Sequence, residues 1–224
     1  SPFQWTKTVA SHLGGTRNPM VITWPKAITD KGGLRSQFGH VNDITPTILE
    51  AAGVPVPEVV DGIRQMPMNG TSLVYSFKDA KAAERHTTQY FEVFGHRAIY
   101  HDGWMASAFH GRLPWATGMA EPEKSFEADT WELYDLRKDY SQSKDLAAKY
   151  PAKLDELKAL FMKEAAANQV LPLGGPTMGD PNLPSLTGKR TAFTYYPGTV
   201  GVPESGAPKM MNRSWDMTAS LEVP

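Results

Sequence analysis

The chain is organised around one stretch near its start, Phe3-Gln4-Trp5-Thr6-Lys7-Thr8-Val9-Ala10-Ser11-His12-Leu13-Gly14-Gly15-Thr16-Arg17-Asn18-Pro19. A lysine precedes a Gly-Gly pair, and an arginine follows it. The apolar run of residues 20–24 comes next and is stopped by Pro25. This pattern predicts a buried strand that follows a glycine turn. Because glycine allows the backbone to take positive φ or to approach other groups closely, a lysine beside such a turn can present its charge to an anion.

The composition permits a globular fold and excludes several functions. The 224 residues are 41% hydrophobic, 10% aromatic and 21% charged, which fits one large or two small domains. With 23 basic and 24 acidic residues the net charge is −1, so there is no excess of positive charge that would indicate binding to nucleic acid. No apolar run reaches the roughly 20 residues of a membrane span, so no membrane partner is expected. The 0 cysteines exclude disulfides and thiolate metal sites and leave the compartment open.

Residues 1–80 are predicted to end with one amphipathic helix and an irregular connection. Asp43 is a candidate N-cap, and Gly53 is a candidate C-terminal stop. Between them an apolar stripe recurs at helical spacing, which predicts a helix packed on a sheet. The stripe consists of Ile44, Ile48, Leu49 and Ala52. Residues 54–69 carry three prolines and predict an extended connection.

Residues 81–173 are predicted to form a small α+β layer. The apolar period changes to two after Thr87, and Asp102-Gly103 is a strong hairpin signal. About four antiparallel strands are therefore expected, over residues 88–94, 97–101, 104–109 and 130–136, with a loop over 111–129. Pro151 opens a helix whose stripe should cover one face of this sheet. The stripe consists of Leu154, Leu157, Leu160 or Phe161, and Ala165.

Residues 174–224 are predicted to be an extended wrapping tail. Glycine and proline punctuate this segment repeatedly, so little regular structure is expected until its end. There, apolar residues from Trp215 to Val223 alternate with polar ones. This alternation predicts a half-buried strand that starts a further β segment.

An ordered set of motifs resembles the sulfatase family of the alkaline phosphatase superfamily, most closely the bacterial arylsulfatases, over roughly residues 1–173. The set comprises Lys7, Gly14-Gly15-Thr16-Arg17, Trp24-Pro25, the stretch from Asp43-Ile44-Thr45-Pro46-Thr47 to Gly53, residues 91–104 and Trp131-Glu132-Leu133-Tyr134-Asp135-Leu136. The resemblance implies an α/β fold class. It predicts the C-terminal edge of a sulfatase-type α/β sandwich in residues 1–80 and a small α+β domain in 81–173. Residues 174–224 follow as an irregular tail that ends in a strand.

The resemblance also implies site residues. Lys7 would contact a sulfate oxygen and offset the charge that develops on the leaving sulfate. His12 could line the substrate pocket, although a structural role is the commoner use of such a histidine. Arg17 is expected to form a salt bridge that holds the loop.

The cofactors of the family are formylglycine, as the nucleophile, and Ca²⁺. The chain lacks the Cys/Ser-x-Pro/Ala-x-Arg motif from which formylglycine is made. We therefore expect a C-terminal portion that is inactive and binds no metal alone. Its expected partners are the N-terminal portion of the same enzyme and a small-molecule sulfate ester.

Two other functions remain open at this point. A phosphonate or phosphate ester hydrolase of the same superfamily is one alternative, because tetrahedral oxyanions resemble one another closely. A non-catalytic, β-rich interaction module is the other. The compartment stays open between the bacterial cytoplasm and the periplasm.

Overall fold

The computed structural model describes residues 2–30, 32–111, 125–173, 187–203 and 206–222. The chain divides into two units, Ser1–Gly175 and Pro176–Pro224, each of which is described by itself. Most of the predicted loop 111–129 lies outside the described residues. The proposed boundary near residue 80 falls inside the first unit and stays a proposal.

The main sheet has four antiparallel strands in the order β3-β4-β5-β6, as the sequence predicts. Phe94-Gly95 and Asp102-Gly103 join the first three strands through tight turns, and all four of these residues have positive φ. Within the sheet, Ile99 pairs with both Tyr90 and Ala106. The strands are β3 Thr88–Val93, β4 His96–His101, β5 Trp104–Ala108 and β6 Trp131–Asp135.

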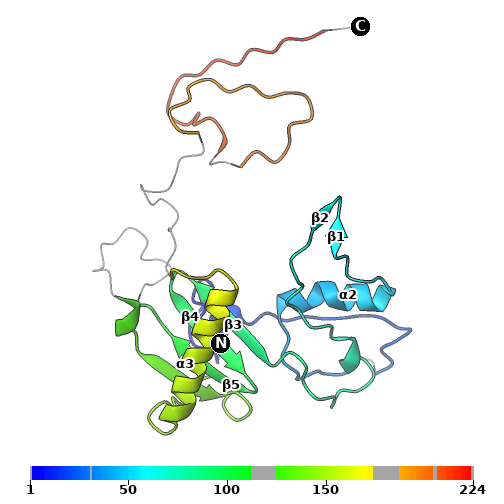
Figure 1. The fold of residues 1–224 in the computed structure, drawn as a ribbon, viewed down its shortest axis with the longest axis vertical. Helices are drawn as coiled ribbons and strands as arrows, with labels where there is room; N and C mark the ends of the chain where they lie inside the picture. The colour runs from blue at the N-terminus through cyan, green and yellow to red at the C-terminus, as the bar shows by residue number, and fades with distance from the viewer. Residues whose placement is uncertain (1, 31, 112–124, 174–186, 204–205, 223–224) are drawn as a thin grey trace. The chain divides into compact units, whose positions relative to one another are not determined.

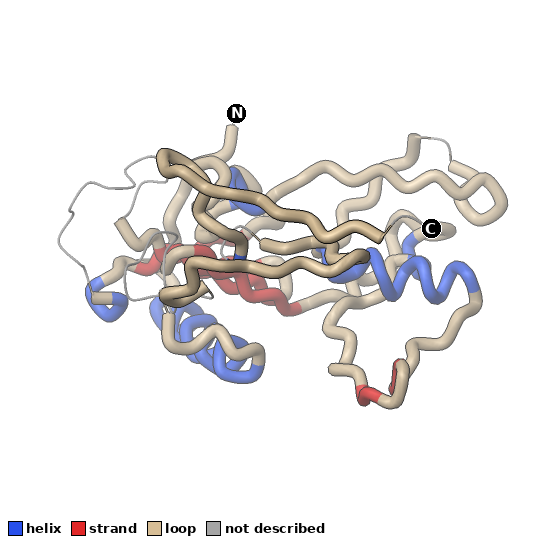
Figure 2. The backbone as a smooth tube through the Cα atoms, turned by 90° about the horizontal axis from the view of Figure 1, so that it is seen from above, coloured by secondary structure: helices blue, strands red, loops and turns tan. Residues whose placement is uncertain are grey.

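Helix α3, Pro151–Ala167, lies across one face of this sheet (Figure 1) and stays beside the strands when the view is turned (Figure 2). Pro151 occupies the first helical turn, where its missing N–H costs little. The predicted stripe faces the sheet: Leu157, Phe161 and Ala165 are fully buried there, and Leu154 and Leu160 pack against this core partly buried. Burial of this apolar surface joins the helix to the sheet, so the predicted α+β layer is confirmed. The core consists of Ile99, Ala106, Leu133, Leu157, Phe161 and Ala165.

The first 80 residues form short elements rather than a second large sheet. Helix α2 has the predicted extent and ends at Gly53, whose φ is 69°. The stripe on α2 is not buried against a sheet as predicted. Two of its residues, Ile44 and Ile48, are 40% and 60% exposed. The elements are α1 Leu13–Thr16, η1 Val41–Asp43, α2 Ile44–Ala52, β1 Val59–Val60, β2 Ile63–Arg64 and η2 Val74–Ser76.

The prediction of a buried strand at residues 20–24 is wrong. These residues form a loop, and Val21 is 90% exposed. A strand needs neighbours for its backbone N–H and C=O groups. The described strands that could supply such neighbours pair with one another instead. The apolar run therefore lies on the surface of this unit.

Asp43 does not cap helix α2 with its side chain, contrary to the prediction. Its fully buried carboxylate accepts hydrogen bonds from the backbone N–H groups of His40 and Thr71, at 2.8 and 2.7 Å. His86 Nδ1 lies 2.7 Å from an oxygen of the same carboxylate, and its Nε2 lies 3.1 Å from the carbonyl oxygen of Thr88. Asp43 thus joins α2 to the start of β3.

The second unit is irregular in its described parts, residues 187–203 and 206–222. The strand predicted from Trp215 is wrong over the described residues 215–222, which are exposed and form no strand. Alternation alone cannot hold a strand that has no partner for its backbone or cover for its apolar face. Val223 lies outside the described residues. Among the described helices, none has the length and apolar character that crossing a bilayer requires.

Candidate functional site

Lys7 lies on a strained turn. The backbone N–H of Val9 donates to the carbonyl of Thr6 at 3.2 Å, which places Lys7 and Thr8 at the centre of the turn. Thr8 has a φ of 73° and Trp5 a φ of 64°. Positive φ is unfavourable for any residue with a side chain, and most of all for a β-branched one. Such strain persists where the surroundings enforce it and is concentrated at functional sites.

The Gly14-Gly15 pair holds this turn by close packing. Both glycines lie inside α1 rather than in a positive-φ turn, so the predicted glycine turn is a short helix. A Cβ on Gly14 would lie 2.0 Å from the carbonyl oxygen of Gln4. A Cβ on Gly15 would lie 1.9 Å from that of Val9 and 2.8 Å from that of Thr6. Only glycine lets α1 support the lysine turn at this distance.

Gln142 fixes the start of α1, a role that the sequence did not reveal. The backbone N–H of Leu13 donates to Gln142 Oε1 at 2.7 Å, and Gln142 Nε2 donates to Ser107 Oγ at 3.3 Å. The side chain of Gln4 also donates to the backbone carbonyl of Gln142. Gln142 is 1% exposed and has a φ of 58°. The turn after β6 therefore clamps the segment that carries Lys7.

His12 is buried behind the lysine turn. Its Nε2 donates to Glu132 Oε2 at 3.0 Å, and its Nδ1 lies 2.9 Å from Ser11 Oγ. A neutral ring satisfies both contacts if the serine hydroxyl donates to Nδ1. His12 is 1% exposed, whereas the side chain of its partner Glu132 is 33% exposed. Its role toward substrate stays a prediction.

A pocket of about 270 Å³ opens beside the lysine turn, and we call it the Trp5 pocket. The Trp5 ring stacks on Phe109 with centroids 4.1 Å apart, and Phe109 stacks in turn on His96 at 4.7 Å. Buried Tyr134 lies under the same region. Burial raises the pKa of its hydroxyl above the usual range, and the charge of Glu132 adds to the rise. The described residues that line the pocket are Gln4, Trp5, Phe109, Gly111, Thr130 and Glu132.

Lys7 and Arg17 differ in their contacts. Lys7 is exposed, and none of the hydrogen bonds or ion pairs found among the described residues involves it. The Arg17 guanidinium lies over the rings of Tyr140 and Phe3, at 4.3 and 5.4 Å from their centroids. Across the described residues these cation–π contacts take the place of the predicted salt bridge, because the neighbours of Arg17 are aromatic. Lys7 is thus the cation of this loop that remains available to a ligand.

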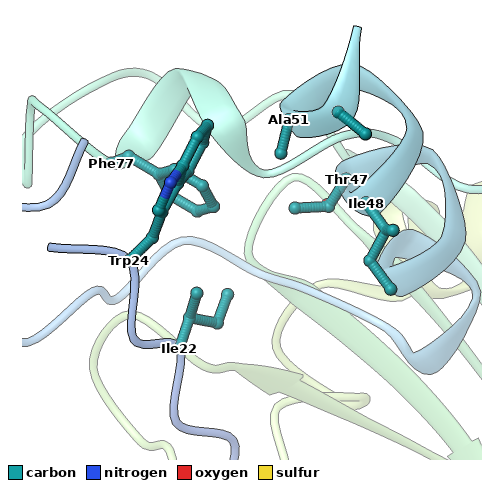
Figure 3. Close-up of a pocket in the computed structure, with 7 residues that line it drawn as sticks. Ile22, Trp24, Thr47, Ile48, Ala51 and Phe77 are labelled. Atoms are coloured by element: carbon teal, nitrogen blue, oxygen red, sulfur yellow. The ribbon is translucent and has the colours of Figure 1, made fainter. Parts of the chain in front are cut away.

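A second, apolar groove of about 370 Å³ lies between the 20–24 loop and α2. Figure 3 shows Ile22 and Trp24 on one side, with Thr47 and Ile48 of α2 opposite. Trp24 meets Phe77 edge to face, with centroids 6.1 Å apart. Apart from the hydroxyl of Thr47 and the indole N–H of Trp24, the side chains that line this groove are apolar. The lining consists of Ile22, Trp24, Thr47, Ile48, Ala51, Ala52 and Phe77. We refer to it as the apolar groove.

The described residues do not fit the calcium site that the family resemblance implies. In the described part of the chain, no three His, Cys, Asp or Glu side chains gather where they could hold one metal ion. The buried carboxylates are already engaged by cations, as in Arg97–Asp129 at 2.6 Å.

Two sequence comparisons find similarity to sulfatases over part of the chain. Residues 1–54 match the model of the sulfatase family. An uncharacterized sulfatase of Schizosaccharomyces pombe is 32% identical over 146 residues, which are 64% of this chain and 24% of that protein. The chain thus spans about a quarter of the curated relative that it matches.

Solved structures show the same fold over part of the chain. The structure of Ps i-CgsB in complex with k-i-k-neocarrahexaose has a TM-score of 0.52 and 22% identity, covering 75% of this chain and 33% of that one. A Bacteroides thetaiotaomicron structure from work on glycosaminoglycan metabolism has a TM-score of 0.50 and 18% identity, covering 70% and 31%. These likenesses concern the fold, and the sequence matches make part of the chain similar to the sulfatase family.

Proposed function

We propose that this chain supplies part of the active site of an arylsulfatase-like enzyme that hydrolyses sulfate esters. The observation that carries the proposal is the strained Thr6–Val9 turn, which presents an uncommitted lysine and rests directly on Gly14-Gly15. Strained backbone is concentrated at functional sites, and here the strained Thr8 lies next to an exposed cation.

In this proposal Lys7 binds a sulfate oxygen. As the ester bond breaks, negative charge grows on the leaving group and the sulfate oxygens. A fixed ammonium group stabilises that charge more strongly in the transition state than in the ground state. The support from α1 matters because a preorganised charge needs no reorganisation during the reaction.

The apolar groove supports a partner for this chain, the N-terminal portion of the same enzyme. Two of the side chains that line it, Ile22 and Ile48, are 38% and 60% exposed in the described structure. An exposed apolar groove of this kind is typical of an interface. Docking of a further sheet against α2 and residues 20–24 would bury these side chains and give the 20–24 run the strand neighbours it lacks here.

The nucleophile and the metal would come from that same portion. The chain has 0 cysteines and lacks the motif that yields formylglycine. Its described residues offer no cluster for Ca²⁺. We therefore propose that this chain binds and orients the ester. Lys7 would bind the sulfate, and His12 would act as a positioning residue through Glu132.

The test is Lys7→Ala in the assembled enzyme, with an aryl sulfate and the matching aryl phosphate as substrates. Loss of one electrostatic contact to the transferring group costs about 10²- to 10³-fold in rate. The matched control is Lys163→Ala, an exposed lysine on α3. If Lys7→Ala keeps the wild-type kcat/KM, Lys7 does not bind the sulfate. Faster turnover of the phosphate ester than of the sulfate ester would replace sulfatase by phosphatase as the function.

A further inference from the structure

We propose that Asn69-Gly70 is a self-modification site, at which the asparagine is converted to aspartate and isoaspartate without an enzyme. Of the asparagines in the sequence, Asn69 alone is followed by glycine. The dipeptide lies in the connection between β2 and η2, where Asn69 is exposed. The inference concerns the attachment of α2 to the sheet and does not depend on the proposed function.

The reaction needs only the chain and water. The backbone nitrogen of Gly70 attacks Cγ of Asn69, and a C–N bond forms. The Cγ–Nδ2 bond breaks, and ammonia leaves with the proton that the backbone nitrogen gives up. Water then opens the resulting succinimide ring at either of its two carbonyl groups. One opening gives aspartate, and the other gives isoaspartate, whose main chain runs through Cβ and Cγ and is one carbon longer.

The structure leaves the attacking group available and imposes the glycine that carries it. Among the hydrogen bonds of the described residues, none uses the backbone N–H of Gly70, so no such bond must break before the attack. A Cβ at this position would lie 1.9 Å from the carbonyl oxygen of Asn42 and 2.9 Å from the backbone nitrogen of Asp43. Because these are backbone atoms, packing excludes every side chain here, including those that would hinder the attack.

Asn69 makes a contact that the conversion destroys. Its Nδ2 donates to Asn168 Oδ1 at 3.2 Å. Asn168 ends helix α3, and its own Nδ2 donates to the carbonyl of Glu164 at 2.9 Å. Asn168 therefore cannot turn its amide toward a new acceptor without losing that bond. Both products place a carboxylate opposite Asn168 Oδ1 and beside the negative end of α3, where a negative charge is unfavourable.

Isoaspartate has a second effect, because it lengthens the main chain. Two residues after Asn69, the backbone N–H of Thr71 donates to Asp43 Oδ1 at 2.7 Å, and this carboxylate joins α2 to β3. Gly70 lies too close to Asn42 to take up the additional carbon. Isoaspartate at position 69 therefore weakens the bond between Thr71 and Asp43, and with it the attachment of α2.

The experiment incubates the 224-residue chain in mildly alkaline buffer and follows each asparagine by peptide mapping. Mass spectrometry with fragmentation that separates aspartate from isoaspartate identifies the products. We expect both products at Asn69 several-fold earlier than at Asn212, an exposed asparagine followed by arginine. Asn69→Gln should abolish the conversion, because glutamine would have to close a larger ring, and the matched control Asn212→Gln should leave the conversion at Asn69 unchanged. Conversion at Asn69 no faster than at Asn212 would overturn the proposal.

The effect on the fold is measured on the converted chain. Loss of about one hydrogen bond should lower the melting midpoint by roughly 2–4 °C. Hydrogen exchange should rise in the peptide that contains Thr71 and stay unchanged around Leu133, in the core of the sheet. Asn69→Asp carries the new charge on a main chain of normal length, so it should lower the midpoint without faster exchange at Thr71. If the isoaspartate chain melts and exchanges like the unconverted chain, the proposed link to α2 is refuted.

Discussion

Gly15→Ala tests whether close packing holds the lysine turn in its working position. The new Cβ would lie 1.9 Å from the carbonyl oxygen of Val9, whereas real Cβ contacts stay beyond 3.0 Å. Helix α1 and the Thr6–Val9 turn must therefore separate by about 1.1 Å. The obstructing atoms are backbone atoms, which cannot rotate away as the end of a side chain can.

A displacement of this size has a known consequence for catalysis. A misplacement of about 1 Å costs on the order of 10²-fold in rate, because the reacting groups leave their productive geometry. We therefore expect kcat/KM for a sulfate ester to fall about 100-fold in the assembled Gly15→Ala enzyme. Melting of the chain itself should also shift downward, since α1 loses its contact with the turn.

The matched control is Gly39→Ala. Its Cβ would meet the nearest atom, in Leu73, at 3.7 Å, which is ordinary contact, and Gly39 is not at positive φ. This variant should keep the wild-type melting midpoint and kcat/KM. If Gly15→Ala behaves like Gly39→Ala in both measurements, α1 does not support the turn, and the reasoning about Lys7 fails with it.

Three further perturbations address the rest of the chain. Leu157→Ala should lower the free energy of unfolding by about 2–5 kcal/mol, measured by denaturant titration, because Leu157 is 0% exposed between α3 and the sheet; a loss below about 0.5 kcal/mol would place the helix outside the core. Val21→Asp should change the melting midpoint little in the isolated chain, where Val21 is 90% exposed, but lower it by several degrees in the assembled enzyme; equal effects in both would refute the proposed interface. Burial, and then the hydrogen bond to Glu84, raise the pKa of Tyr100, so its contribution to stability is full below about pH 10, where unfolded tyrosine titrates, and is lost at higher pH. Denaturant titrations from about pH 8 to 11 should therefore show a smaller loss of unfolding free energy in Tyr100→Phe than in the wild type. An unchanged pH profile in this variant would contradict the assignment.

The sheet and its covering helix could be predicted because their signals are local. Asp102-Gly103 specifies a tight turn whatever surrounds it, and the strands on both sides pair with their nearest neighbours in sequence. The stripe of Leu157, Phe161 and Ala165 likewise lies on one face of a single helix. A hairpin pairs strands that are neighbours in the sequence, and an amphipathic helix repeats its apolar residues with a fixed period. The sequence alone is therefore enough to recognise both.

The wrong predictions concern strands whose partners could not be named. Residues 20–24 and 215–222 have the composition of strands, yet composition gives only the tendency to pair and not the neighbour that completes the ladder. The predicted side-chain cap at Asp43 is wrong for a related reason. It stands where a helix cap belongs, but its carboxylate bonds to His86, 43 positions away.

The candidate site was predictable in part. The spacing and the family resemblance single out Lys7 and the glycine pair; the structure packs the pair against the lysine turn, and the role of Lys7 toward sulfate stays a prediction. Gln142 was not predictable, because its bond to Leu13 joins positions 129 residues apart, and an isolated glutamine gives no sequence signal. The Trp5 pocket escaped prediction for the same reason, since Trp5 and Phe109 meet only in the folded chain.

The clamp at Gln142 has a practical consequence for anyone who wishes to shorten this protein. The lysine turn is encoded by the first residues, but its support reaches through α1 to the turn beyond β6. A fragment cut at the proposed boundary near residue 80 would keep Lys7 and lose the group that anchors the first turn of α1. A shortened version that preserves the geometry of the lysine turn must therefore extend at least to Gln142, so this turn cannot be transferred as a short peptide.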